Sequence, residues 1–193
     1  MTRTPIVVVL GGPNGAGKST TAARLLRGAL SVNEFVNADT IAQGLSAYRP
    51  ESAAIAAGRV MLARLRYLAR IREDFAFETT LAGRGHARWL ESLRAAGYRA
   101  HLTFLWLPSP DLAVARVAER VRRGGHGVPE PVVRRRFAAG LRNLVTCYLD
   151  GVDSWQIYDN SGMEEPLLMA SRDAGASPEI VDSEAWQALL KRT

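Results

Sequence analysis

Residues 11–20 read Gly11-Gly12-Pro13-Asn14-Gly15-Ala16-Gly17-Lys18-Ser19-Thr20, and the apolar run 6–10 (Ile-Val-Val-Val-Leu) stands directly before them. The spacing Gly-x4-Gly-Lys-Ser is that of a P-loop, a turn that folds its backbone around phosphate groups. Glycines let N–H groups approach an anion closely, and a helix that starts at the turn adds the positive end of its dipole. Residues 20–30 are rich in Ala, Leu and Arg and favour that helix. Strand, turn and helix together predict a nucleoside triphosphate site at residues 12–20.

Two side chains of the motif are expected to act on the nucleotide directly. The Lys18 ammonium is a compact charge that reaches the β- and γ-phosphates, and the Ser19 hydroxyl is placed to ligate Mg²⁺. All cationic residues other than Lys18 and Lys191 are arginines. A lysine thus occurs where a point charge suits the phosphates better than a planar fork. We expect ATP or GTP as the phosphoryl donor, bound with Mg²⁺.

Length and composition indicate an ordinary globular chain. The 193 residues, 47% of them hydrophobic, suffice for one domain over residues 1–193 that includes the P-loop. No apolar run approaches the length of a membrane helix, so no membrane partner is expected. The single cysteine, Cys147, excludes an internal disulfide and fits a reducing cytoplasm. With one Cys and three scattered His, a zinc site made by the protein alone is not expected.

The net charge of +6 raises the question of a nucleic-acid partner. Most arginines lie on amphipathic segments, where a solvated face is the usual reading. Aromatic residues make up 7% of the chain and are not interleaved with basic ones, as a base-stacking surface would require. The sequence therefore argues against nucleic acid as the main partner, and phosphate-rich small substrates explain the charge more simply.

Apolar runs that favour strands alternate with amphipathic runs that favour helices. Strands are expected at 6–10, 34–37, 75–77, 101–107 and 154–158, with a weaker one at 167–170. Helices are expected at 20–30, 51–72, 86–96, 109–123, 129–149 and 183–191. The core-facing stripe of helix 51–72 is expected to be Ile55, Leu62, Leu65, Leu68 and Ile71. The alternation predicts an α/β P-loop NTPase fold: a mostly parallel five-stranded sheet flanked by helices, with a small helical lid.

Carboxylates follow two of the expected strands, at the sheet edge where ligands bind in such folds. Asp39 comes after the second strand and is a candidate general base for an acceptor hydroxyl, with a helix cap as the alternative. Glu78 ends the third strand and either holds the acceptor or binds Mg²⁺ through water, with a plain surface glutamate as the alternative. Thr79 and Thr80 either donate to a substrate phosphate or cap the next helix.

Two arginine-rich helices joined by the glycine-rich segment 124–129 predict a lid over residues 110–135. Arg116, Arg120 and Arg123 share one helical face at spacings of four and three. A solvated face is the plain reading, but a lid that closes would present one or two of these arginines to the γ-phosphate. Arg120 and Arg123 are the candidates for that role. His126 in the glycine segment is expected to be structural.

Several blocks, in order and spacing, resemble the zeta-toxin family of P-loop kinases, especially its short Gram-negative members. They are GGPNGAGKST (11–20), VNADTIAQGLS (36–46), FAFETTLAGRGH (75–86), the run from AGYRAH to RNL (96–144) and WQIYDNSG (155–162). The resemblance spans about residues 5–170.

This resemblance implies transfer of phosphate from ATP or GTP with Mg²⁺ to a sugar hydroxyl of UDP-N-acetylglucosamine or a related UDP-sugar. It also implies a toxin paired with a small helical antitoxin that covers the nucleotide site. By resemblance, Asp39 is the general base, Glu78 and Thr80 bind the acceptor, and Lys18 and Ser19 belong to the nucleotide site. The first lid arginine is Arg120, and the second is Arg123 or one of the cluster 134–136.

Two other functions fit the P-loop alone. An ATPase module of a transporter is disfavoured because no LSGGQ-like segment follows and no hydrophobic strand ends in an Asp-Glu pair. A nucleic-acid 5′-hydroxyl kinase is favoured by the charge and disfavoured by the lack of an aromatic, basic groove. Carboxylates at two further strand ends favour a small-molecule kinase over both.

Overall fold

The computed structural model describes residues 3–27, 32–162 and 165–193. Its strands are β1 (Ile6–Gly11), β2 (Glu34–Val36), β3 (Phe75–Thr79), β4 (Arg99–Trp106), β5 (Ser154–Asp159), β6 (Leu167–Arg172) and β7 (Glu179–Ile180). Its α-helices are α1 (Lys18–Arg27), α2 (Ala38–Leu45), α3 (Ala54–Arg70), α4 (Gly85–Ala95), α5 (Pro110–Arg122), α6 (Glu130–Asn143) and α7 (Ser183–Leu190). A 3-10 helix, Pro50–Ala53, precedes α3, and a π-helix, Leu144–Tyr148, extends α6.

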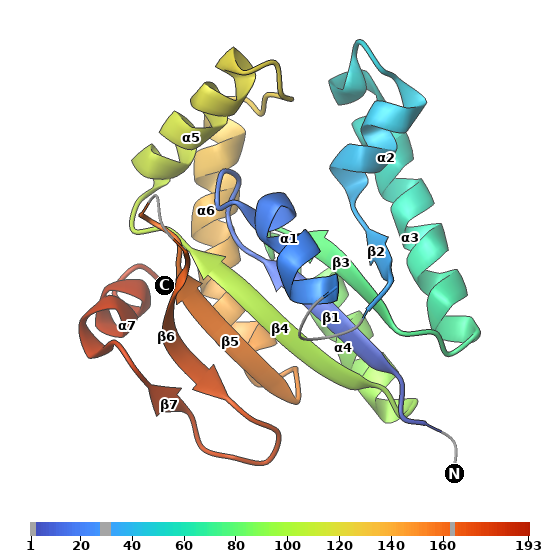
Figure 1. Cartoon of the computed structure of the whole chain (residues 1–193), viewed down its shortest axis with the longest axis vertical. Helices are drawn as coiled ribbons and strands as arrows, with labels where there is room; N and C mark the ends of the chain where they lie inside the picture. The colour runs from blue at the N-terminus through green and yellow to red at the C-terminus, as the bar shows by residue number, and fades with distance from the viewer. Residues whose placement is uncertain (1–2, 28–31, 163–164) are drawn as a thin grey trace.

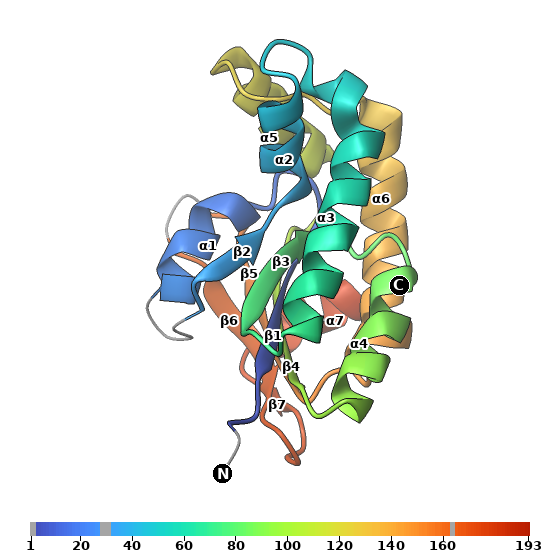
Figure 2. The same cartoon turned by 90° about the vertical axis from the view of Figure 1, so that its right-hand side faces the viewer.

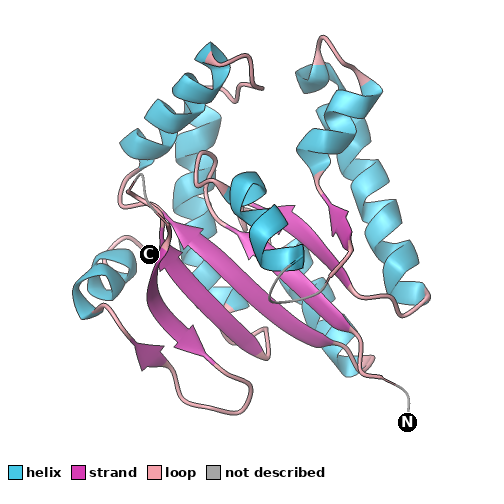
Figure 3. Cartoon of the chain, in the orientation of Figure 1, coloured by secondary structure: helices cyan, strands magenta, loops and turns pink. Residues whose placement is uncertain are grey.

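The strands form one sheet in the order β2-β3-β1-β4-β5-β6-β7 (Figures 1 and 3). The first five strands along the chain are parallel, β6 is antiparallel to β5, and β7 is antiparallel to β6. The α/β class and the mostly parallel sheet are confirmed. The sheet is two strands wider than the five expected, because the weak strand at 167–170 is the full strand β6 and pairs with β7.

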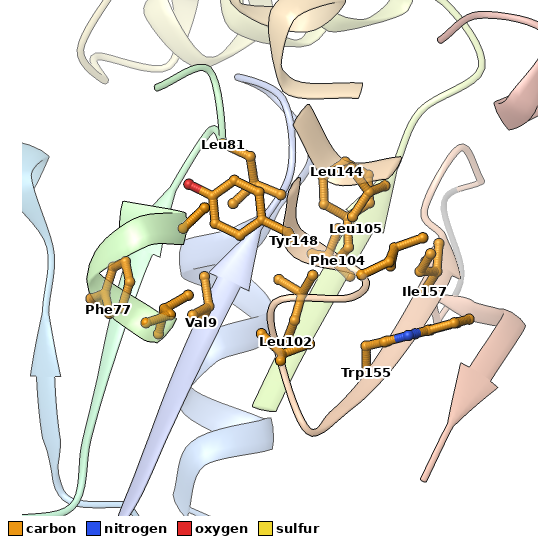
Figure 4. Packing of buried hydrophobic residues seen from close by; sticks show 14 of the residues in the cluster. Val9, Phe77, Leu81, Leu102, Phe104, Leu105, Leu144, Tyr148, Trp155 and Ile157 are labelled. Carbon is orange, nitrogen blue, oxygen red and sulfur yellow. The ribbon is translucent and has the colours of Figure 1, made fainter. Parts of the chain in front are cut away.

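The sheet is covered unequally on its two faces. Figure 2 shows α3, α4, α6 and α7 on one face and α1 on the other. The larger core lies under the four helices and includes Phe77, Leu102, Tyr148 and Trp155, all of which are buried (Figure 4). The smaller core lies under α1 and contains Val8, Leu10, Ala22, Val32 and Ala76. The parallel strands are thus apolar on both faces, as expected for a covered parallel sheet.

The expected helix 51–72 is wrong in its start and in its buried face. The chain forms α2, which was not expected, then the 3-10 helix, and only then α3. The buried face of α3 is Ala57, Met61, Leu65 and Leu68, at spacings of four, four and three. Ile55, Leu62 and Ile71 are exposed, so only two members of the expected stripe face the core. The prediction took these three residues as buried because they are apolar. A helix buries only the residues at spacings of four and three on the side that faces the core, so apolar residues between those positions stay in solvent.

No helix in the described parts of the chain combines the length and the apolar character that a membrane span needs.

Candidate functional site

The P-loop lies at the carboxyl end of β1, between the ends of β3 and β4 (Figure 1). Two of its glycines are required by the fold. Gly12 has a φ of 147°, and a Cβ there would lie 2.6 Å from the Leu105 carbonyl oxygen. Gly17 has a φ of 80°, and a Cβ there would lie 2.8 Å from Nδ2 of Asn160. The turn is therefore closely approached by the Leu105 backbone on one side and by the Asn160 side chain on the other, and α1 begins directly after it, at Lys18.

Lys18 is buried, with 6% of its surface exposed. Its ammonium donates to the carbonyl oxygens of Gly12 at 2.8 Å and Pro13 at 2.9 Å, and lies 3.6 Å from Oε1 of Glu78. Burial lowers the pKa of Lys18, while the negative charges of Glu78 and Asp39 counteract that shift. The ammonium is thus held at the P-loop by two backbone carbonyl groups and by Glu78, while Asp39 acts on it only through its charge.

Glu78 ends β3 and connects three functional segments. Its Oε2 accepts a hydrogen bond from the Ser19 hydroxyl at 2.8 Å and from Nδ2 of Asn37 at 2.7 Å. β3 is the neighbour of β1 in the sheet, so the last residues of both strands lie side by side. A carboxylate and a hydroxyl at hydrogen-bond distance give the oxygen ligands that Mg²⁺ prefers. This contact links Glu78 to the predicted Mg²⁺ ligand.

Asp39 lies in the first turn of α2, immediately beyond the end of β2. The helix cap is Asn37, whose Oδ1 accepts from the backbone N–H groups of Asp39 at 2.7 Å and Thr40 at 3.2 Å. The alternative reading of Asp39 as a cap is therefore wrong, because Asn37 already fills that position. The Asp39 carboxylate forms no hydrogen bond or ion pair with another described residue, so it remains available to a ligand.

Two cavities meet at these side chains. The P-loop cavity, of about 590 Å³, extends from the P-loop to α5. The strand-end cavity, of about 370 Å³, extends from the P-loop to Thr80, Gly83 and Arg136. Six residues line both: Asn14, Lys18, Asn37, Asp39, Glu78 and His126. Asp39 therefore faces two chambers, one beside the P-loop and one beyond the ends of β2 and β3.

The arginines of α5 differ in their surroundings. Arg116 donates to the carbonyl oxygens of Asn160, Ser161 and Gly162 at 2.6–2.9 Å, so it holds the segment after β5. Arg120 lines the P-loop cavity, and its Nε and Nη2 atoms are buried without a hydrogen-bond partner among the described residues. Arg123 is 78% exposed in its side chain and pairs with Glu119 on its own helix.

The glycine segment between α5 and α6 packs against Arg120. Gly125 donates its N–H to the Arg120 carbonyl oxygen at 2.9 Å, and a Cβ at Gly125 would lie 2.6 Å from Cγ of Arg120. His126 follows and lines both cavities. The sequence predicted only a structural role for His126 and did not place it at the site. Arg136 of α6 is half-buried in the strand-end cavity and forms no hydrogen bond or ion pair with another described residue.

The segment after β3 is held by α6. Thr79 accepts from the Leu81 N–H through Oγ1 at 3.1 Å, and both Thr79 and Thr80 line the strand-end cavity. Leu81 has a φ of 56°, and its carbonyl oxygen accepts from Nδ2 of Asn143 at 2.8 Å. Gly140 brings the α6 backbone so close to the Thr80 carbonyl oxygen that a Cβ there would overlap it. The position of Thr80 therefore depends on a helix about sixty residues further along the chain.

Several site residues were not expected from the sequence. Asn37 was read only as the end of a strand, but an Asn directly before a helix is a capping signal that was available. Asn160 donates through Nδ2 to the Ala16 carbonyl oxygen at 2.7 Å, which ties the segment after β5 to the P-loop. No local signal in the sequence indicates that contact, because 144 residues separate the two partners.

The chain matches a known protein family over most of its length. A family described as an AAA domain matches residues 7–145, which include the P-loop, Asp39, Glu78 and Arg120. The chain belongs to this AAA domain family. An uncharacterized protein of Haemophilus influenzae is 28% identical over 126 residues, which cover 65% of this AAA domain protein and 88% of the relative.

Solved structures share the fold. A structure of the PezAT chromosomal toxin-antitoxin system of Streptococcus pneumoniae matches 99% of this AAA domain protein and 86% of that chain, with a TM-score of 0.64 and 17% identity. The AvrRxo1-ORF1:AvrRxo1-ORF2 complex with sulphate ions matches with a TM-score of 0.74 and 15% identity over 96% of the chain. The chain spans 63% of that neighbour's length. These likenesses confirm the zeta-toxin-like P-loop fold that the resemblance implied.

Proposed function

We propose that this AAA domain protein is a kinase that transfers the γ-phosphate of ATP to a hydroxyl group of a small molecule. The observation that carries the proposal is the junction of two cavities at Lys18 and Asp39. A P-loop chamber beside a second chamber, with an unpaired carboxylate between them, supplies a donor site, an acceptor site and a base. An ATPase needs no second chamber of this kind.

The P-loop cavity suits a triphosphate. Lys18 brings one cation to it, and Arg120 brings a second whose Nε and Nη2 have no acceptor among the described residues. Oδ1 of Asn14, at the turn itself, is likewise buried without a partner. Buried polar atoms without partners are rare in folded proteins and mark places where a ligand completes the hydrogen bonding. The related fold of AvrRxo1-ORF1:-ORF2 has been solved with ATP, which supports ATP as the donor here.

Mg²⁺ fits the residues at the start of α1 and near the end of β3. Ser19 and Glu78 would hold the ion, since a hydroxyl and a carboxylate lie 2.8 Å apart there and Mg²⁺ usually takes one or two protein ligands with phosphate and water. When bound, the ion neutralises charge that develops on the transferred phosphate. Asn37 keeps the Glu78 carboxylate in place through its own hydrogen bond.

The chemistry at Asp39 is a proton transfer coupled to phosphoryl transfer. The Asp39 carboxylate accepts the proton of the acceptor hydroxyl, whose oxygen forms a bond to the γ-phosphorus. The bond between that phosphorus and the bridging oxygen to the β-phosphate breaks, and ADP leaves with the electron pair. Lys18 and Arg120 stabilise the negative charge on the transferred group. We place Arg136 at the acceptor side, because it lines the strand-end cavity and no residue within 3–27, 32–162 or 165–193 pairs with it.

The acceptor we propose is UDP-N-acetylglucosamine or a related UDP-sugar, bound through Glu78 and Thr80 in the strand-end cavity. The similarity of this chain to the zeta-toxin family supports that acceptor, as does a cavity with both carboxylate and hydroxyl groups. We further propose a toxin role with a small helical antitoxin, supported by the fold shared with the PezAT toxin-antitoxin system. A growth test would check it: expression of the wild type should arrest growth, and Lys18→Ala should relieve the arrest.

The kinase proposal is tested by phosphate transfer from radiolabelled ATP to UDP-sugars, free sugars, nucleosides and 5′-hydroxyl oligonucleotides. We expect labelled UDP-N-acetylglucosamine. Asp39→Asn should lower kcat by about 10²–10⁴-fold with unchanged ATP affinity, because it removes the base and keeps the volume. Label confined to oligonucleotides would instead identify a nucleic-acid kinase.

The same assay separates the lid arginines. Arg120→Ala should lower kcat on the order of 10³-fold, the effect typical of an arginine at the transferred phosphate. Arg122→Ala is the matched control, since Arg122 is exposed, pairs with Glu119 and lines neither cavity. Arg123→Ala tests the second predicted lid arginine, and its pairing with Glu119 leads us to expect a change of less than about tenfold. Equal losses of kcat in all three variants would indicate that α5 acts on the phosphate through its net charge and not through one arginine.

A further inference from the structure

A cavity beside α4 takes no part in the chemistry proposed above. Its volume is about 580 Å³, within the range of about 300–1,000 Å³ that small-molecule sites usually have. One wall is α4, on the face of the sheet that α6 also covers (Figure 2), and the other is the end of the π-helix with the turn after it. We call this space the α4 cavity. It shares no described lining residue with the P-loop cavity or the strand-end cavity, so it is a separate place on the molecule.

Small side chains on both walls leave room in the α4 cavity. Ala87 is the buried residue of the α4 wall, and Gly151 is on the opposite wall. A Cβ at Gly151 would lie 2.6 Å from the Cys147 carbonyl oxygen, so the turn has no space for a larger residue there. Thr146 and Cys147 complete that wall with a hydroxyl and a thiol. The charged groups of the cavity therefore come from α4 and from Asp150.

Two of the charged residues are already balanced by a neighbour or by water. Arg94 pairs with Asp153 at 2.9 Å, so its charge is neutralised within the protein. Asp150 lies 3.6 Å from Arg172, and its side chain is 95% exposed. Water and salt screen a charge in that position. Neither residue is expected to hold a ligand.

The other three charged residues have atoms without partners. Arg84 donates through Nε to Oδ1 of Asn143 at 3.1 Å, while its Nη1 and Nη2 have no acceptor among the described residues. Arg88 and Glu91 form no hydrogen bond or ion pair within the described parts of the chain. Spacings of four and three place all three side chains on one side of the helix. The cavity thus offers two guanidinium groups followed by one carboxylate.

We propose that the α4 cavity binds a small zwitterion, namely a free amino acid or a short peptide. The carboxylate of the ligand lies at Arg84 and Arg88, whose planar forks match a pair of oxygens. Its ammonium lies at Glu91. This arrangement matches every free charge of the cavity. A simple anion satisfies the two arginines only and is repelled by the glutamate beside them.

The α4 cavity is connected to the segment 80–84 by hydrogen bonds. Asn143, which accepts from Arg84, donates through Nδ2 to the Leu81 carbonyl oxygen at 2.8 Å. Tyr148, at the end of the π-helix, donates through its hydroxyl to the Gly83 carbonyl oxygen at 2.9 Å. A ligand in the α4 cavity therefore contacts two elements that hold this segment.

We expect occupancy of the α4 cavity to favour binding in the strand-end cavity. Arg84 is exposed, so water competes for its guanidinium when no ligand is bound. A carboxylate at Nη1 and Nη2 keeps the guanidinium where Nε meets Asn143, which supports the segment that begins with Thr80. By linkage, the acceptor raises the affinity for the zwitterion by the same factor. This coupling rests on the proposed kinase function, whereas the binding itself does not.

Binding is measured without turnover through Cys147, the single cysteine of the chain. Cys147 is half-buried and lines the α4 cavity, so a ligand there shields its thiol from alkylation by iodoacetamide. The probes are glycine, diglycine and triglycine, in which the carboxylate and the ammonium lie progressively further apart. N-acetyl-diglycine lacks the ammonium, and diglycine amide lacks the carboxylate. All are used at about 10 mM, which saturates a site with a Kd of about 1 mM.

We expect at least one of the three zwitterions to slow alkylation about threefold or more, and neither blocked probe to do so. Equal protection by N-acetyl-diglycine would identify a simple anion site and overturn the zwitterion. No protection by any of the three zwitterions would overturn the site itself.

Arg88→Gln and Glu91→Gln each remove one free charge at an exposed position of α4. We expect both to abolish protection by the zwitterion, each variant being compared with its own rate without ligand. Glu91→Gln should also allow N-acetyl-diglycine to protect, because the repelling carboxylate is gone. Arg99→Gln is the matched control, since Arg99 is exposed and lines none of the three cavities. Thermal unfolding checks that each variant is folded, and protection that persists in Arg88→Gln and Glu91→Gln would contradict the assignment.

The coupling is measured with the kinase assay. We expect the protecting zwitterion to lower the KM for UDP-N-acetylglucosamine about threefold or more in the wild type, with the KM for ATP unchanged and no effect in Arg88→Gln. Protection of Cys147 without a change in the acceptor KM would overturn the coupling and leave the site standing. Protection in a protein that phosphorylates no UDP-sugar would support the site and overturn the proposed acceptor.

Discussion

Glu78 shows how a single side chain can connect the P-loop with the proposed acceptor side of the site. Its carboxylate meets the hydroxyl of Ser19, the amide of Asn37 and, at longer range, the ammonium of Lys18. The sequence left Glu78 open between acceptor binding and Mg²⁺. The 2.8 Å contact with Ser19 favours Mg²⁺ as its principal role, since the hydroxyl in the first turn of α1 and the carboxylate on β3 could both reach one ion.

Ser19→Ala is expected to raise the Mg²⁺ concentration for half-maximal activity by about tenfold or more, because one oxygen ligand is lost. Binding of ATP in the presence of EDTA should be unchanged, since the hydroxyl serves the ion and not the phosphates. Ser92→Ala, at an exposed position of α4, is the control. Titration of kinase activity with Mg²⁺ measures the effect, and an unaltered curve for Ser19→Ala would refute the assignment.

At the level of elements, α6 determines the shape of the strand-end cavity, the proposed acceptor site. Gly140 allows its backbone to approach the Thr80 carbonyl oxygen, and Asn143 fixes the next carbonyl along. Asn143 also accepts from Nε of Arg84, just before α4. One helix therefore positions both ends of the segment 80–84, part of which lines the strand-end cavity.

Gly140→Ala is expected to destabilise the fold by about 1–3 kcal/mol, because the new methyl group overlaps backbone that has little room to move. It should also raise the acceptor KM by displacing Thr80, with the KM for ATP little affected. Gly58→Ala, at an open helical position, should stabilise the fold by about 0.5–1 kcal/mol. Urea unfolding and steady-state kinetics measure both effects. Equal stability changes in the two variants would contradict the close approach of α6.

For the whole molecule, we expect a half-buried imidazole in the sheet to make stability depend on pH. His101 of β4 contacts the Ser154 hydroxyl of β5 at 2.8 Å and Thr103 at 3.2 Å. Burial lowers the pKa of His101 to about 4, against 6.5 in the unfolded chain. The unfolded state therefore binds the proton more tightly, so the stability is complete above pH 6.5 and is lost as the pH falls toward 4.

We expect the free energy of unfolding to fall by up to about 3 kcal/mol from this group between pH 6.5 and pH 4. His101→Gln removes the titration and keeps a polar side chain between the two strands. Urea unfolding at half-unit pH steps measures the slope, which should be shallower in the variant by up to one proton. Carboxylates contribute equally to both proteins, so parallel slopes would show that His101 does not titrate as described.

The sequence alone determined the P-loop, the order of the parallel strands along the chain and the position of Asp39 and Glu78 at strand ends. These follow from local rules: glycine spacing, apolar runs, and the fact that parallel strands end at one edge. The prediction of the buried face of helix 51–72 was wrong, because the exposed residues Ile55, Leu62 and Ile71 are as apolar as the residues of a buried stripe.

Only the tertiary structure decided which side chains meet. The contact of Asn160 with Ala16 and the support of Thr80 by Gly140 join residues far apart along the chain. The difference between the paired Arg123 and the unpaired Arg120 likewise depends on neighbours in space. The physical reason is that the residue type determines which chemistry a side chain can perform. Whether the side chain is free to perform that chemistry depends on its burial and its partners, and these are set by the packing of the whole chain.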